Sequence, residues 1–107
     1  MTQIHFEWGG DTLFGYISGE VDHHWAAKLR EAIDSQILRK APLTLVLDLG
    51  GVTFMDSSGV GLILGRYKLM DTFGGRVIVQ NPSRTVGRML ELSGIGSVVE
   101  MMNGGRQ

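Results

Sequence analysis

Residues 43–79 decide the fold, and their sequence is LTLVLDLGGVTFMDSSGVGLILGRYKLMDTFGGRVIV. The apolar run at 43–47 predicts a buried strand that is covered on both faces. The run at 77–79 predicts a second strand of the same kind. Between them, apolar residues recur at helical spacing, namely Val60, Ile63, Leu64 and Tyr67. Strand, helix and strand over about 35 residues form a βαβ unit with parallel strands and a right-handed crossover.

The residues before this unit predict a hairpin and a helix. Residues 4–8 and 13–17 have extended patterns on either side of a Gly-Gly-Asp turn. Helical spacing begins after Asp22, which is a good N-cap, and Pro42 prevents the helix from continuing. The residues expected on the buried face of this helix are Ala26, Leu29, Ile33 and Ile37.

The residues after the unit predict one more helix and one more strand. Residues 81–83 begin a helix that Gly94 ends, and residues 97–100 predict a last edge strand. The predicted order is ββαβαβαβ. We therefore expect an α/β fold, with helices packed against a mixed, mainly parallel β-sheet in one domain over residues 1–107.

Composition excludes several classes of function. Ten Lys and Arg against eleven Asp and Glu give a net charge of −1, so no basic nucleic-acid interface is expected. Cysteine is absent, and the adjacent His23 and His24 diverge by about 100° on a helix, which does not favour a metal site. No apolar run approaches the roughly 18 residues that span a bilayer. We expect a cytoplasmic protein without metal, cofactor, nucleic-acid or membrane contacts.

The turn before the central helix is the candidate site, because open α/β sheets bind their ligands at the carboxyl ends of strands. Asp56, Ser57 and Ser58 could all serve as helix caps, and capping alone explains them. Capping does not explain the three glycines that follow within the helix, since each costs about 1 kcal/mol relative to alanine. They are Gly59, Gly61 and Gly65. A neighbouring strand, a phosphate or a partner protein must come close to this helix.

Two enzymatic or ligand-binding interpretations use the same turn. The glycines nearly match the dinucleotide motif G-x-G-x-x-G, but the third lies one position late and Asp56 adds a negative charge. A serine hydrolase would pair Ser57 or Ser58 with His23 or His24, but G-x-S-x-G is absent. A small nucleotide-binding protein or a Ser-dependent hydrolase is therefore the alternative to a binding module.

A small hydroxyl at an exposed helix N-terminus also suits reversible phosphorylation. A phosphoserine carries about −1.5 to −2 charges, which the helix dipole and unpaired N–H groups tolerate. A partner packed over the same turn would have to desolvate that charge. A penalty of a few kcal/mol lowers affinity about a hundredfold to a thousandfold.

Four segments of this chain resemble the anti-sigma factor antagonists of the STAS domain family. They are GEVDHH at 19–24, FMDSSGVG at 54–61, LGRY at 64–67 and NPS at 81–83. The Asp-His-His element favours the sporulation group, the anti-sigma F factor antagonists, over general-stress relatives. The resemblance implies a single STAS domain that is a non-enzymatic anti-anti-sigma factor.

The resemblance also implies how the protein is regulated. The unphosphorylated form would bind an anti-sigma factor that is also an ATP-dependent serine kinase, and would thereby release the sigma factor. The kinase would phosphorylate the serine beside the glycine, Ser58, and a membrane-bound serine phosphatase would restore it. The expected partner contacts are Asp22, Asp56, Ser57, Gly59, Val60 and Leu62.

Some of these contacts have a structural explanation as well. Val60 and Leu62 fit a place in the core equally well, and Asp22 is first of all a helix cap. Arg66 is expected on a solvated helix face, with an acidic partner surface as the alternative.

The end of the chain departs from the family pattern. Family members usually continue into a C-terminal helix, whereas this sequence stops at Gln107, so that helix is expected to be missing or truncated. Exposed methionines and an uncovered sheet face would then favour self-association into a homodimer. The sequence does not decide between monomer and dimer.

Overall fold

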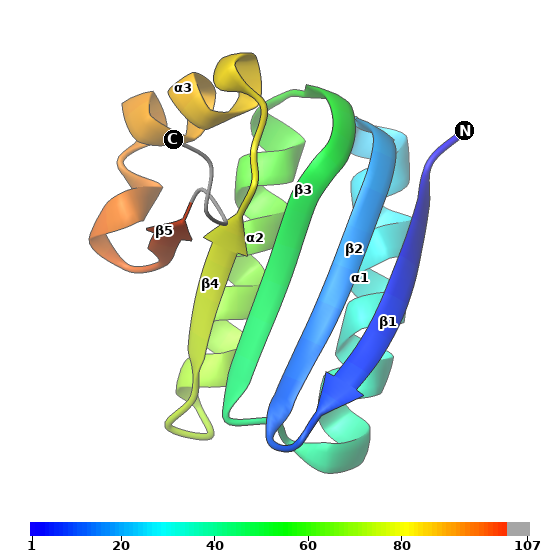
Figure 1. The fold of residues 1–107 in the computed structure, drawn as a ribbon, viewed down its shortest axis with the longest axis vertical. Coiled ribbons are helices and arrows are strands. Elements are labelled where there is room, and N and C mark those ends of the chain that lie inside the picture. The colour runs from blue at the N-terminus through cyan, green and yellow to red at the C-terminus, as the bar shows by residue number, and fades with distance from the viewer. Residues whose placement is uncertain (103–107) are drawn as a thin grey trace.

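The computed structural model describes residues 1–102, and its elements follow the predicted order (Figure 1). The strands are β1 (Gln3–Gly9), β2 (Thr12–Val21), β3 (Thr44–Met55), β4 (Arg76–Gln80) and β5 (Glu100–Met102). The helices are α1 (His23–Lys40), α2 (Ser57–Asp71) and α3 (Arg84–Ser93), with a short 3-10 helix, η1 (Ile95–Ser97). The expected loss of a C-terminal helix concerns residues 103–107, which lie outside the described residues.

The five strands form one sheet in the order β1-β2-β3-β4-β5. Strand β1 is antiparallel to β2, and the other neighbouring pairs are parallel, so the predicted mixed, mainly parallel sheet is confirmed. Helices α1 and α2 lie side by side behind the sheet in Figure 1. Their apolar faces and the facing strand residues make one hydrophobic core.

The prediction that both faces of the central strand are covered is wrong. No helix of the described part of the chain covers the face of β2 and β3 that carries Phe14, Tyr16 and Val46 (Figure 1). Val46 is nevertheless buried, and its neighbours on the adjacent strands are Phe14 and Ile78. Phe14 and Tyr16 stack with ring centroids 6.2 Å apart.

Two predicted boundaries are also wrong. Strand β3 does not stop at residue 47 but continues through Gly50 and Gly51 to Met55. A Cβ atom on Gly51 would lie 2.8 Å from Cβ of Ser18, so this glycine permits close strand approach and does not mark a linker. The last strand begins at Glu100, because the residues before it form η1.

The buried face of α1 agrees with the prediction, whereas that of α2 agrees only in part. Ala26, Leu29, Ile33 and Ile37 are all buried. Of the residues predicted for the central helix, Ile63 is buried, and the other three are only partly buried against the core. The buried residues of α2 are Gly59, Leu62, Ile63, Arg66 and Met70. The difference arises because α2 packs against α1 as well as against the sheet.

A polar network joins Asp48 of β3 to the end of β4 and to the loop before α3. The Oδ2 atom of Asp48 accepts hydrogen bonds from Nε2 of Gln80 at 2.9 Å and Nδ2 of Asn81 at 2.8 Å. Asn81 has a left-handed backbone with φ of 58°, which asparagine tolerates better than most residues. Ser83 then caps α3 by accepting the N–H of Val86. Within residues 1–102, no helix is long and apolar enough to cross a membrane.

Candidate functional site

The junction between β3 and α2 holds the predicted phosphoacceptor. Asp56 caps α2, since its Oδ1 atom accepts the N–H of Ser58 at 2.8 Å. Ser57 is exposed and Ser58 is half-buried. The Ser58 Oγ atom takes part in no hydrogen bond within residues 1–102. The hydroxyl therefore lies in the first turn of the helix, and it is not used for capping.

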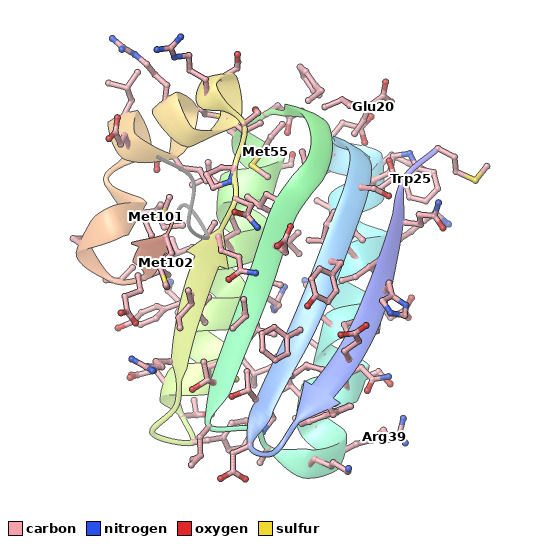
Figure 2. All side chains as sticks on the ribbon, viewed as in Figure 1. Glu20, Trp25, Arg39, Met55, Met101 and Met102 are labelled. Atoms are coloured by element: carbon pink, nitrogen blue, oxygen red, sulfur yellow. The ribbon has the colours of Figure 1, made fainter. Side chains whose placement is uncertain are left out.

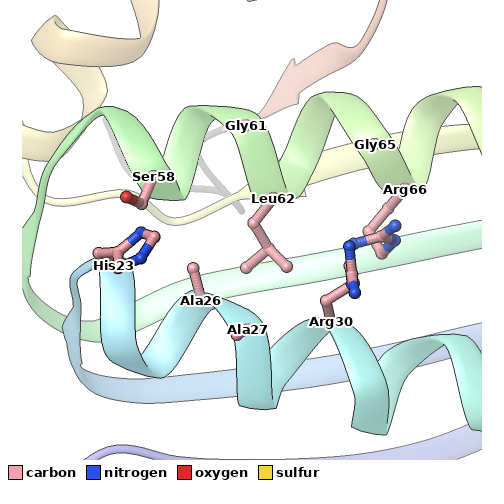
Figure 3. A pocket seen from close by; sticks show the side chains of 9 residues that line it. All are labelled: His23, Ala26, Ala27, Arg30, Ser58, Gly61, Leu62, Gly65 and Arg66. Atoms are coloured by element: carbon pink, nitrogen blue, oxygen red, sulfur yellow. The ribbon is translucent and has the colours of Figure 1, made fainter.

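Helix α1 begins beside this junction. The last residues of β2 and β3, Val21 and Met55, are paired, so α1 and α2 begin at the same edge of the sheet. Asp22 caps α1 by accepting the N–H of Trp25 at 3.0 Å, as predicted. His23 is the first residue of α1, and Figure 3 shows its ring facing the Ser58 hydroxyl.

An open groove of about 370 Å³ runs between α1 and α2 (Figure 3). We call it the α1–α2 groove. Ser58 and His23 lie at one end, and Arg30 and Arg66 lie at the other. The residues that line it are His23, Ala26, Ala27, Arg30, Ser58, Gly61, Leu62, Gly65 and Arg66.

The three glycines of α2 have different environments. Gly59 faces the end of β3, where a Cβ atom would lie 2.7 Å from Sδ of Met55. Gly61 and Gly65 line the groove, and a Cβ atom at either position would meet no neighbouring atom within 4 Å. A neighbouring strand residue therefore explains the first glycine, but packing within the described chain explains neither of the others.

Arg66 is not on a solvated face, contrary to the prediction. It is 6% exposed, and its Nε atom lies 2.8 Å from Oδ1 of Asp34 on α1. The two groups form an ion pair, but their geometry is not that of a hydrogen bond. The Nη1 atom of Arg66 likewise has no hydrogen-bond acceptor in the described chain. Burial lowers the pKa of the Arg66 guanidinium, Asp34 opposes this effect, and the nearby Arg30 adds to it.

The structure separates the two predicted apolar contacts. Leu62 is 5% exposed and belongs to the core between α1 and α2, and it also lines the α1–α2 groove. The burial of Leu62 follows from the position of α1, which the helical spacing of α2 alone does not give. Val60 is partly buried and packs at the edge of the core.

Two further residues near the site, Phe54 and Arg30, were not predicted as site residues, and a third, His23, was considered only as the base of a hydrolase. Phe54, paired with Glu20 near the ends of β3 and β2, is 50% exposed, which is unusual for a large aromatic side chain. His23 and Arg30 lie on the groove wall that α1 provides. The sequence contains Phe54 within the segment 54–61, but no local pattern brings Arg30 to α2, because that contact depends on how the helices pack.

Comparisons with known proteins agree on one family. The sequence profile of the STAS domain matches residues 9–104. The anti-sigma F factor antagonist of Paenibacillus polymyxa is 40% identical over 97 residues, which cover 91% of this chain and 83% of the relative. The solved structure of unphosphorylated SpoIIAA, an anti-sigma factor antagonist, superposes with a TM-score of 0.82 at 34% identity, over 95% of this chain and 90% of that one.

A second solved structure shows a modified form of such a protein. Phosphorylated SpoIIAA, described as a Bacillus cell fate determinant, has a TM-score of 0.74 at 33% identity. The match covers 95% of this chain and 93% of that one. Together with the profile match and the shared order of strands and helices, these similarities show that the chain belongs to the STAS domain family.

Proposed function

We propose that this chain is an anti-sigma factor antagonist whose unphosphorylated form binds an anti-sigma factor, and that phosphorylation of Ser58 prevents this binding. The observation that carries the proposal is the Ser58 hydroxyl, which lies unbonded in the first turn of α2 and lines an open groove. The relative from Paenibacillus polymyxa bears the name of such an antagonist, and SpoIIAA has been solved in both phosphorylation states. No comparison supports the nucleotide-binding or hydrolase alternative.

The position of Ser58 accounts for a change in binding without a change in fold. A phosphate there would add about −1.5 to −2 charges at the positive end of the α2 dipole, where the domain tolerates them. A partner that covers the turn would have to desolvate the phosphate beside the Asp56 carboxylate. A cost of about 3 to 4 kcal/mol would lower affinity by a factor of several hundred.

The partner would contact the surface around this hydroxyl. We assign Ser57, Val60 and the capped turn of Asp56 and Gly59 to this surface, with Asp22 at its edge. Leu62 supports the surface from the core. We propose that the chain acts by binding and not by catalysis, in the cytoplasm where sigma factors meet RNA polymerase.

The partner proposed here is an anti-sigma factor with serine kinase activity, and a serine phosphatase would reverse its action. Incubation with the kinase of the same organism and ATP, followed by mass mapping, should place one phosphate on Ser58. Ser58→Ala should fold and bind the kinase but take up no phosphate. A phosphate on Ser57 instead, or a Ser58→Ala chain that fails to fold, would contradict the assignment.

Ser58→Asp tests the charge mechanism separately from the kinase reaction. We expect weaker binding to the anti-sigma factor in a titration, and an almost unchanged Tm. Ser35→Asp is the matched control, since it adds the same charge at an exposed position of α1 outside the α1–α2 groove and should leave the affinity unchanged. Equal affinity of Ser58→Asp and the unmodified chain would refute electrostatic exclusion.

The face of the sheet without helices supports a homodimer as a further proposal. It carries Phe14 and Tyr16, and Met102 at its edge is 46% exposed. Phe14 pairs with Val46, which pairs with Ile78, so apolar residues run across three strands of this face. Apolar surface of this kind favours self-association. Sedimentation equilibrium should then show a dimer that Tyr16→Lys dissociates, whereas a monomer at all concentrations would refute it.

A further inference from the structure

The α1–α2 groove contains space that the chain itself does not use. Gly61 and Gly65 lie on its α2 wall, and neither has a neighbouring atom within 4 Å of where a Cβ atom would be. Each glycine within a helix lowers the stability of the helix relative to alanine. Internal packing gives no reason for this cost, whereas a group that enters the groove from outside would need the space.

The same groove contains a buried donor without an acceptor. Arg66 is 94% buried, because its exposed fraction is 6%, and its Nη1 atom has no hydrogen-bond partner in residues 1–102. An unpaired buried donor of a charged group is strongly unfavourable. Nη1 is closed to solvent, but Arg66 lines the groove, so an acceptor on a bound molecule would pair with it after a small rotation of the guanidinium.

The charges at this end of the groove are unbalanced. Arg66 and the exposed Arg30 lie next to each other in Figure 3, and Asp34 is the carboxylate that pairs with Arg66. Two guanidinium groups and one carboxylate leave a positive charge. A second carboxylate placed between the two arginines would neutralise it and accept hydrogen bonds from both.

We propose that the α1–α2 groove receives a segment of the anti-sigma factor, which passes over Gly61 and Gly65 and places an aspartate or glutamate side chain between Arg30 and Arg66. This inference rests on the proposed function and adds a second contact to it. The groove is continuous with Ser58, so a partner that covers the hydroxyl is already at its entrance. Charge complementarity selects an acidic segment.

The first test removes one arginine and keeps the core. Arg30→Gln takes away an exposed charge at the groove, and Arg39→Gln takes away the same charge at the far end of α1 (Figure 2). Titration calorimetry with the anti-sigma factor of the same organism should show about tenfold weaker binding for Arg30→Gln. Arg39→Gln should bind as the unmodified chain does.

The second test fills the space above the glycines. Gly65→Leu places a side chain in the groove, and Lys68→Leu adds the same side chain to an exposed position of α2 outside it. Gly65→Leu should keep or raise the Tm, because its Cβ meets no neighbour, and should weaken binding at least tenfold. Lys68→Leu should leave affinity unchanged.

The outcomes separate this inference from the proposed function. If the unmodified chain binds and both groove variants bind with the same affinity, the groove is empty in the complex and the inference is wrong, while the proposed function stands. Equal losses in the groove variants and their controls would also overturn it. If the unmodified chain does not bind at all, the proposed function fails, and this inference fails with it.

Discussion

Gly59 and Gly61 show that one residue type serves two purposes within a single helical turn. A side chain at Gly59 would collide with Met55, whereas a side chain at Gly61 would extend into open space. Gly59→Ala should lower the free energy of unfolding by about 1 to 3 kcal/mol through overpacking. Gly61→Ala should raise it by up to about 1 kcal/mol through helix propensity. Urea denaturation of both variants checks this, and changes of equal sign would contradict the different environments.

Asp56 contributes a cap hydrogen bond and a negative charge, and two substitutions separate them. Asp56→Ala removes both and should cost about 1 kcal/mol of stability, whereas Asn is as good an N-cap. Asp56→Asn should therefore remain within a few tenths of a kcal/mol of the unmodified chain in thermal and urea unfolding. If Asp56→Asn loses as much stability as Asp56→Ala, the charge and not the hydrogen bond stabilises α2.

The packing of α1 on α2 depends at one point on the ion pair between Asp34 and Arg66. Asp34→Ala would leave the buried guanidinium without its carboxylate, and we expect a loss of about 3 kcal/mol, the low end for a buried pair because Asp34 is partly exposed. The double variant Asp34→Leu/Arg66→Met should recover most of that loss. Guanidinium chloride denaturation measures both, and a double variant less stable than Asp34→Ala would contradict this account.

Element order could be predicted because each element carries its own local signal. Local sequence alone indicates the N-caps Asp22, Asp56 and Ser83 and the apolar spacing of α1. The length of β3 could not be predicted, because Gly51 looks like a loop residue in the sequence. Only its close contact with Ser18 of the adjacent strand explains why a glycine lies within the strand. Local signals therefore give the order of elements, while their ends depend on neighbours.

The candidate site likewise combines features that the local sequence predicts with features that depend on packing. An unbonded Ser58 hydroxyl follows once Asp56 is the cap, but the sequence allowed Asp56, Ser57 or Ser58 to cap the helix. The choice of Ser58 over the more exposed Ser57 came from family resemblance, since both are accessible. Burial of Leu62 and Arg66, and the groove itself, depend on the contact with α1, which no residue of α2 specifies.

Across the whole molecule, stability should fall from the middle of the sheet toward β5. Strands β2 and β3 are paired on both sides, whereas β5 has three residues and pairs only with β4. Native-state hydrogen exchange should show the slowest amides in β2 and β3 and the fastest strand amides in β5. Uniform protection across all five strands would contradict this gradient.

The position of Ser58 on the wall of the α1–α2 groove would determine when the proposed phosphorylation and its reversal can occur. An anti-sigma factor bound over that wall would also hide the Ser58 hydroxyl from every other enzyme in the cell. Only the bound anti-sigma factor could then phosphorylate Ser58. A phosphatase would reach the phosphate only after the complex dissociates. The lifetime of the complex would therefore set the duration of each cycle of phosphorylation and dephosphorylation.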